Sequence, residues 1–182
     1  MNELWENIKK RRTENIVLKQ RLETCAKMIA SCLKSNSPEK EKLELIKKII
    51  RISSEVGDFR KTADVISSHA LQYVSDRGRR LKNGDISLQS HMKNELRHEH
   101  LVPCSVLAKL IHTNQLQENM IYNALIENGI RAIITKEEDK KIDIIKLKSK
   151  MPDSWEFGCN PFARYSISQI HNLQIKPTNI AP

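Results

Sequence analysis

The sequence predicts a predominantly helical α+β fold, with a basic helical region at residues 1–82 and a small domain of a two-stranded sheet and helices at 83–182. Apolar residues recur at steps of three and four along most of the first 81 residues, which is the spacing of a helical face. The chain contains only 5 glycines and 6 prolines, too few for a turn-dense all-β fold. The segment 130–135 (IRAIIT) is short, rich in β-branched residues and preceded by glycine, which indicates a strand.

The first expected element is one long helix from about Leu4 to Cys32. Its apolar seam consists of Leu18, Leu22, Cys25, Ile29 and Cys32, and the same register runs back through Asn15, Arg11, Ile8 and Leu4. Such a seam packs against another helix. We therefore expect a helical hairpin or bundle, with a protein partner or a second copy of the chain as an alternative source of the facing helix.

Two further helices are expected before residue 82. Ser37 followed by Pro38 is typical of an N-cap with proline at the first helical position, and this helix runs to about Val56. Gly57 stops it and Asp58 caps the next helix. The third helix has a stripe of Phe59, Ala63, Ile66, Ala70 and Tyr73.

The second half begins after the turn Asn83-Gly84-Asp85, where we place the boundary between the two regions. It is expected to contain a strand at 96–102, helices at 104–112 and 116–127, and the strand at 130–135. Thr135 and Glu138 form the capping-box pattern of a helix that continues to about Leu147. The aromatic-rich stretch after residue 152 is expected to pack against the protein and 176–182 to form a loose tail.

Charge and cysteine usage narrow the function classes. The 31 lysines and arginines exceed the 22 acidic residues, for a formal charge of +9, and 19 of the basic residues lie in the first 90 positions. This excess favours contact with nucleic-acid phosphates. No apolar run or leader predicts a membrane or secreted protein, and Cys25 and Cys32 are expected to be buried thiols, so a reducing cytoplasm is expected.

Two basic clusters and two separate arginines are the candidate nucleic-acid contacts. They are Lys9, Lys10, Arg11 and Arg12 in the first helix, Arg77, Arg79, Arg80 and Lys82 at the end of the third, and Arg97 and Arg164. The second cluster also has a purely structural explanation, since cations stabilise a helix C-terminus.

The segment 97–103 concentrates the residues most able to carry chemistry. His98, Glu99 and His100 supply two imidazoles and a carboxylate just before Pro103. These groups are metal ligands, and imidazole is a general base near neutral pH. Because alternate strand residues face opposite sides, all three meet one ion only if the strand bends. Alternatively, the histidines are ordinary strand residues.

Glu99-His100-x-x-Pro103 resembles the opening motif of the HNH, or ββα-metal, endonucleases. The resemblance implies a β-hairpin packed on a helix, with His100 as general base on a water and Glu99 as ligand of a divalent cation such as Mg²⁺, Mn²⁺, Ni²⁺ or Zn²⁺. Residues 133–139 are similar to the strand-to-helix passage of some divergent members. This similarity implies Glu138 or Asp139 as a further ligand, beside His98, and the resemblance covers about 97–147.

The first function predicted is therefore metal-dependent hydrolysis of nucleic-acid phosphodiesters. The alternative is a non-enzymatic nucleic-acid-associated or regulatory protein, such as a phage- or plasmid-type inhibitor, that acts through its helical region. A structural adaptor built on the first helix is a third hypothesis. The glycine-rich phosphate loops, the G-x-S-x-G nucleophile motif and the H-E-x-x-H zinc motif are missing from the sequence.

Overall fold

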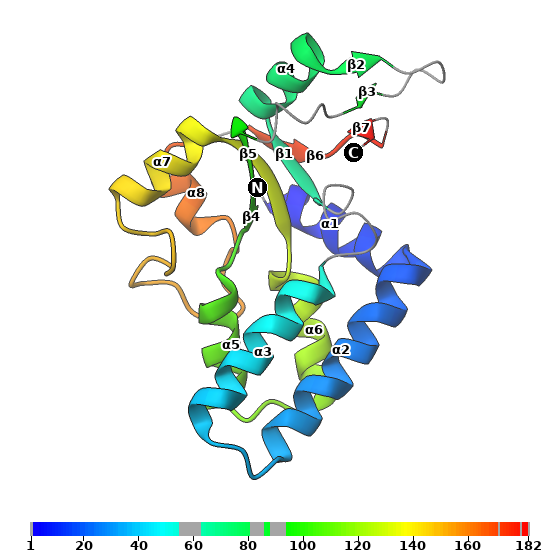
Figure 1. Ribbon diagram of the computed structural model, residues 1–182, viewed down its shortest axis with the longest axis vertical. Helices are drawn as coiled ribbons and strands as arrows, with labels where there is room; N and C mark the ends of the chain where they lie inside the picture. Colours follow the sequence, from blue (N-terminus) through cyan, green and yellow to red (C-terminus); the bar gives the residue numbers. More distant parts are fainter. Residues whose placement is uncertain are drawn as a thin grey trace.

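The computed structural model describes residues 2–54, 63–80, 86–87, 94–170, 172–178 and 180–181. Over these residues the predicted class is confirmed: the chain is a predominantly helical α+β protein (Figure 1). The helices are α1 (Asn2–Glu14), α2 (Ile16–Lys34), α3 (Glu39–Ser53), α4 (Ser68–Arg77), α5 (Cys104–Thr113), α6 (Glu118–Asn128), α7 (Lys136–Ile144) and α8 (Ala163–Ile167). The strands are β1 (Val65–Ser67), β2 (Arg79–Arg80), β3 (Ile86–Ser87), β4 (Leu96–His100), β5 (Arg131–Thr135), β6 (Leu173–Ile175) and β7 (Ile180–Ala181).

The larger sheet has the strand order β4-β5-β1-β6, with β1 parallel to β5 and the other two pairs antiparallel. The expected two-stranded sheet is therefore the β4–β5 part of a four-stranded one. The two additional strands are three residues long and come from 65–67 and 173–175. A second, smaller sheet has the order β2-β3-β7.

Two helical hairpins form the other end of the molecule (Figure 1). The α2–α3 hairpin packs on the α5–α6 hairpin, so that α2 contacts α6 and α3 contacts α5. The apolar seam of α2 supplies Leu22, Cys25, Ala26, Ile29 and Cys32 to this shared core. The helix that faces the predicted seam thus belongs to the same chain.

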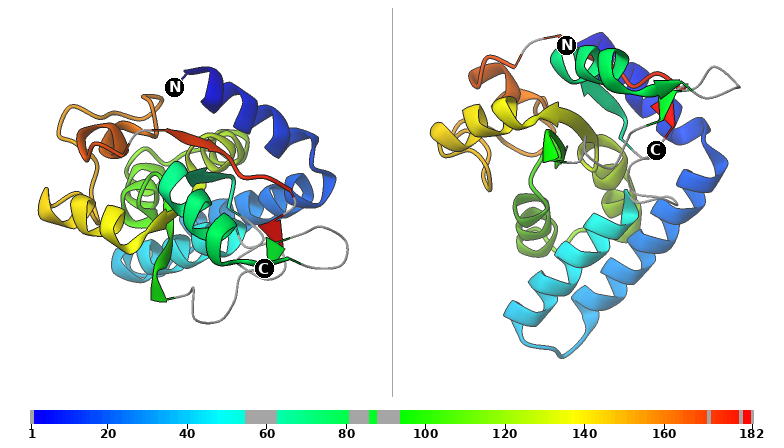
Figure 2. Two further views of the ribbon diagram at one scale, coloured as in Figure 1. Left: turned by 90° about the horizontal axis from the view of Figure 1, so that it is seen from above. Right: turned by 45° about the horizontal axis from the view of Figure 1, so that its top comes forward.

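Both faces of the larger sheet are covered. Val65, Ala132 and Ile134 pack in one apolar cluster with residues of α1, α7 and α8. Ile66 and Ile133 point to the other face, where they pack with α4. The views in Figure 2 show α1 and α4 on either side of the strands.

The predicted boundary at 82/83 falls in 81–85, outside the described residues, so it stays a prediction. Described residues from both sides of it nevertheless share one sheet and one helical core. Strand β1 lies between β5 and β6, and α2 and α3 pack on α5 and α6. The two regions are thus joined by extensive contacts.

The prediction of one long first helix is wrong, because two helices, α1 and α2, form this part of the chain. Asn15 separates them: its side-chain oxygen accepts a hydrogen bond from Leu18 N at 3.0 Å, which is an N-cap that starts a new helix. The next helix begins at Glu39, and Pro38 rather than Ser37 is its N-cap residue. In α3 the buried side is Ile46, Ile49 and Ile50, while Leu45 and Ile52 are exposed.

The third predicted helix is also wrong in its first half. Val65 and Ile66 are in β1, because they pair with Ala132 and Ile133 of β5, and α4 starts only after Ser67. The proposed stop and cap at Gly57 and Asp58, and the first stripe residue Phe59, lie outside the described residues. A stripe of apolar residues three and four apart thus spans a strand followed by a helix.

Other expectations are confirmed locally. Strand β5, the α5 and α6 helices and the capping box of Thr135 and Glu138 are where the sequence indicates. The aromatic-rich stretch packs only in part as predicted, since Phe162 and Tyr165 are fully buried but Phe157 is 38 % exposed. The tail is different from the prediction, since Lys176 is buried and 180–181 pair with β3.

All four cysteines are free thiols, and Cys25 and Cys32 are buried as predicted. Burial raises the pKa of both thiols, which makes them poor nucleophiles. None of the described helices combines the length and apolar content required to cross a bilayer.

Candidate functional site

Strand β4 separates the predicted catalytic residues into two sets. Its side chains alternate, so Arg97 and Glu99 lie on one face and His98 and His100 on the other. The strand keeps its antiparallel register with β5 through His100, which pairs with Arg131. The chain bends at Leu101 and Val102, after His100, so the bend does not bring Glu99 and the two imidazoles to one ion.

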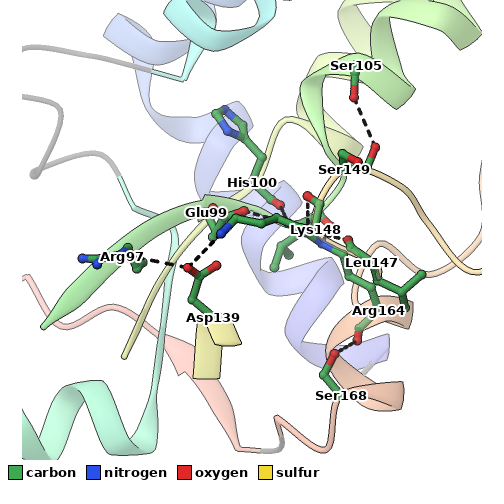
Figure 3. A network of polar contacts seen from close by, with 11 residues as sticks. Arg97, Glu99, His100, Ser105, Asp139, Leu147, Lys148, Ser149, Arg164 and Ser168 are labelled. Atoms are coloured by element: carbon green, nitrogen blue, oxygen red, sulfur yellow. Dashed lines mark hydrogen bonds and ion pairs between the residues drawn. The ribbon is translucent and has the colours of Figure 1, made fainter. Parts of the chain in front are cut away.

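Glu99 is held by Arg164 of α8 (Figure 3). An Oε of Glu99 accepts a hydrogen bond from Arg164 Nη2 at 3.1 Å. Burial raises the pKa of Glu99, and the guanidinium of Arg164 opposes that rise. The same guanidinium is fully buried and donates to the carbonyls of His100, Leu101, Leu147 and Lys148. Arg164 thus ties β4 to the segment after α7.

Asp139, in the first turn of α7, lies on the same side as Glu99. Its Oδ2 is 3.4 Å from Lys148 Nζ and 4.0 Å from Arg97 Nε. The negative charge of Asp139 contributes to the raised pKa of Glu99, which shows that the two carboxylates are close. Three cations, Arg97, Lys148 and Arg164, neutralise this pair, so the group behaves as an ion-pair network (Figure 3).

Glu138 belongs to a different environment. Its carboxylate accepts hydrogen bonds from Thr135 N at 2.8 Å and from Ser67 Oγ at 2.6 Å. Its other oxygen is 3.1 Å from Nδ1 of His69, whose side chain is exposed. Glu138 therefore completes the helix cap of α7 and joins it to the start of α4.

The imidazole of His100 points away from Glu99 (Figure 3). Its Nε2 lies 2.9 Å from Ser54 Oγ, just beyond the end of α3. Burial, together with the positive charges of Arg131, Arg51, Arg164 and Arg12, lowers the pKa of His100 to about 3. The ring is neutral at physiological pH, but a group with this pKa is a weak general base.

The predicted metal ligands thus lie in three separate places. Glu99 and Asp139 lie together and are neutralised by basic residues, Glu138 caps α7, and His98 and His100 lie on the opposite face of β4. Within the described ranges, no group of three or more histidine, cysteine or acidic side chains is arranged to hold a metal ion.

The basic residues of α1 have different surroundings. Lys9 lies over the Trp5 ring and 2.6 Å from Glu6, and Lys10 is 3.9 Å from Glu14. Arg12 is only 2 % exposed, and its guanidinium donates to Asp64 at 2.7 Å and to the Leu125 carbonyl. Arg12 is therefore a structural arginine rather than a surface contact.

The remaining predicted nucleic-acid contacts also differ in their exposure and in their partners. Arg77 is exposed at the end of α4 and lies over the Tyr73 ring, whereas Arg164 is fully buried. Arg97 donates to the carbonyls of Asn94 and Leu96 in addition to its contact with Asp139. Of the others, Arg79 and Arg80 form β2, and Lys82 lies outside the described residues.

A cavity of about 370 Å³ lies where the sheet meets the helical bundle. Arg11 and Arg12 of α1, Asn15 before α2, Ser54 after α3, Asp64 before β1 and Lys176 after β6 are among its lining residues. Sequence reasoning did not identify Ser54, Asp64 or Lys176 as site residues. The one sequence signal that could have indicated this cavity was the pair of polar positions, Asn15 and Arg11, that interrupts the apolar seam of the first predicted helix.

Comparison of the chain with protein-family models, with curated proteins and with solved structures gives no significant match. The function proposed below therefore depends on the chain's own residues and their arrangement.

Proposed function

We propose that this protein binds nucleic acid without hydrolysing it, through contacts between lysines on its helical region and the phosphate backbone. The observation that carries this proposal is a row of cations on α2. Lys19, Lys27 and Lys34 are exposed and lie eight and seven residues apart. Each is about two helical turns from the next, so they share one side of the helix.

The lysines of this row outnumber the acidic residues beside them. Among the described residues, none of the three lysines forms an ion pair within 4.0 Å. Helix α2 contains one acidic residue, Glu23, which is exposed and lies four residues from both Lys19 and Lys27. Three lysines against this one carboxylate still give the row a net positive charge, which attracts a polyanion by release of its counterions.

Neighbouring helices carry further exposed cations. Lys40 and Lys48 of α3 and Arg11 of α1 are exposed, and Lys40 and Lys48 lie near Glu44, whose pKa their charges help to lower. Lys9 and Lys10 pair with exposed glutamates of their own helix, and such surface pairs contribute about 0–1 kcal/mol. A phosphate can replace a carboxylate in pairs that weak.

The arrangement of β4 favours this binding function over the nuclease prediction. Nuclease action by the predicted mechanism requires the His100 base and the Glu99 ligand to face one phosphate. The two residues lie on opposite faces of β4, and Glu99 is occupied by Arg164. The nuclease and its divalent cation stay predictions, and the binding assay below includes a test for them.

The binding test uses fluorescence anisotropy with labelled double-stranded DNA, single-stranded DNA and RNA of one sequence. The triple variant K19Q/K27Q/K34Q removes the α2 row. A matched control, K140Q/K141Q/K150Q, removes the same charge from exposed lysines in and after α7. We expect the first variant to weaken binding by about a hundredfold and the control to weaken it by less than threefold, since each phosphate contact is worth about 1 kcal/mol.

Equal loss in the two triple variants would contradict the proposal, because it would show dependence on net charge alone. The same samples are then incubated with plasmid and Mg²⁺ or Mn²⁺. Cleavage that disappears in His100→Ala and with a chelator would restore the nuclease mechanism in place of the proposed one.

A further inference from the structure

The outer face of helix α3 has an ordered distribution of charge. Its exposed residues within 41–52 are Glu41, Glu44, Leu45, Lys48, Arg51 and Ile52. They recur at steps of three and four residues, so they lie on one side of the helix, and the buried isoleucines lie on the other. The two glutamates come in the first half of this face and the two basic residues in the second half.

An apolar strip runs along the same face. Leu45 is 48 % exposed and Ile52 is 49 % exposed, and the two are about two helical turns apart. Arg21 Nε of α2 donates to the Ile52 carbonyl at 3.0 Å, which places Arg21 beside Ile52. Because α2 and α3 form a hairpin, Met28, seven residues after Arg21, lies beside Leu45 (Figure 1). Met28 is 51 % exposed, so it widens the strip.

The charged groups of this face are free to contact another molecule. Among the described residues, neither Glu41 nor Lys48 has an ion-pair partner within 4.0 Å. Glu44 is 2.6 Å from Lys47, and this pair is exposed at the glutamate, where water screens it. The charge of Lys48 helps to lower the pKa of Glu44, which places Lys48 near the boundary between the acidic and basic halves.

The order of these residues is self-complementary in one direction only. A two-fold axis across the middle of α3 sets the helix of a second copy antiparallel to the first. The two glutamates of one chain then face the two basic residues of the other, and every contact occurs twice. Leu45 lies near the axis, where the apolar strip of the copy covers it. A parallel arrangement would instead place like charges opposite each other, which is unfavourable.

We propose that the outer face of α3, residues 41–52, is the interface of a homodimer in which the two α3 helices pack antiparallel. Burial of Leu45, Ile52 and the adjacent Met28 supplies the attraction, and the ion pairs between chains set the direction. Helix α3 has 15 residues and is about 22 Å long, so the interface is small and the dimer dissociates on dilution. The dimer does not depend on nucleic-acid binding by the α2 row.

The first test is sedimentation velocity of the full chain, without nucleic acid, from micromolar to submillimolar concentrations. We expect a reversible equilibrium between monomer and dimer. Leu45→Glu should weaken the dimer about a hundredfold or more, because it removes the central apolar contact and places two carboxylates near the axis. The matched control is Ile144→Glu, at an exposed isoleucine of α7, which should leave the equilibrium unchanged. Urea unfolding checks that each variant is folded.

The second test reverses the charges of the interface. Glu41→Lys and Lys48→Glu should each weaken the dimer about tenfold or more, because like charges then meet twice across the axis. The double variant E41K/K48E exchanges the two charges and should restore most of the affinity. An equal mixture of the two single variants should form mixed dimers. Lys140→Glu, at an exposed lysine of α7, is the control for net charge.

A wild type that stays monomeric at all these concentrations would overturn the proposal and leave the face to a different partner. A dimer that survives Leu45→Glu would place the interface elsewhere. Single charge reversals that act no more strongly than Lys140→Glu, or a double variant no tighter than either single one, would overturn the antiparallel arrangement of α3.

Discussion

His100 is a histidine that its surroundings keep uncharged. Its pKa is about 3 in the folded chain, against about 6.5 in an unfolded one, so the unfolded state binds the proton more readily. Neutral His100 therefore makes its full contribution to the free energy of unfolding above about pH 6.5, and this contribution is lost as the pH falls from there toward 3.

We therefore predict that lowering the pH from 7 to 5 reduces the free energy of unfolding of both the wild type and His100→Gln, and that the reduction is about 2 kcal/mol larger in the wild type. Glutamine can keep a hydrogen bond to Ser54 without titrating in this range. Urea unfolding at the two pH values measures the difference. An NMR titration in which the His100 ring protonates with a midpoint near 6.5 would show that the arginines do not act on it as described.

Arg164 is predicted to be the most sensitive polar residue of the fold. Arg164→Met should destabilise the protein by about 3–5 kcal/mol, because it strands the Glu99 carboxylate and several buried carbonyls. Arg164→Lys should recover little, since one ammonium cannot replace a fork of donors. The measurement is urea unfolding, with exposed Arg77→Met as control. A loss below 1 kcal/mol would mean that these contacts are not important for stability.

Sequence reasoning at this scale identified local contacts and missed distant ones. The capping box was readable because Thr135 and Glu138 are three residues apart. Glu99 and Arg164 were each singled out, but 65 positions separate them, and no periodicity links residues across that distance. The role of Glu99 as an ion-pair partner therefore became visible only in the fold.

At the scale of elements, Ser67 joins two helices. Its hydroxyl oxygen accepts from Ala70 N as the N-cap of α4 and donates its proton to Glu138 of α7. Ser67→Ala should therefore cost about 2 kcal/mol, more than the loss of a cap alone, because a buried carboxylate also loses a donor. Thermal or urea unfolding measures this, with Ser31→Ala on the exposed side of α2 as control. Equal values for the two variants would remove the proposed link.

Helix and strand positions were predictable where one signal acted alone. The short β-branched run before Thr135 and the three-four spacing of the α2 seam each favour one kind of element, and both predictions hold. The seam register alone did not reveal the break at Asn15, because an N-cap can occur without disturbing the three-four spacing. Residues 65–67 became a strand because β5 was available to pair with them, which is a tertiary effect.

At the scale of the whole molecule, the core crosses the predicted boundary between the two regions. A fragment of residues 1–82 would lack α5 and α6, against which α2 and α3 pack, and β5, which pairs with β1. We expect this fragment to show no cooperative unfolding transition by circular dichroism, whereas the full chain shows one. A cooperative transition in the fragment would establish 1–82 as an independent domain.

The salt dependence of nucleic-acid binding tests the central claim most directly. For double-stranded DNA, the logarithm of the association constant should fall linearly with the logarithm of salt concentration, and removing three phosphate contacts should reduce the slope by about 3. We expect this reduction in K19Q/K27Q/K34Q and not in K140Q/K141Q/K150Q. A wild-type affinity that does not change with salt, or the same slope in all three proteins, would contradict the proposal that the α2 row binds the phosphate backbone.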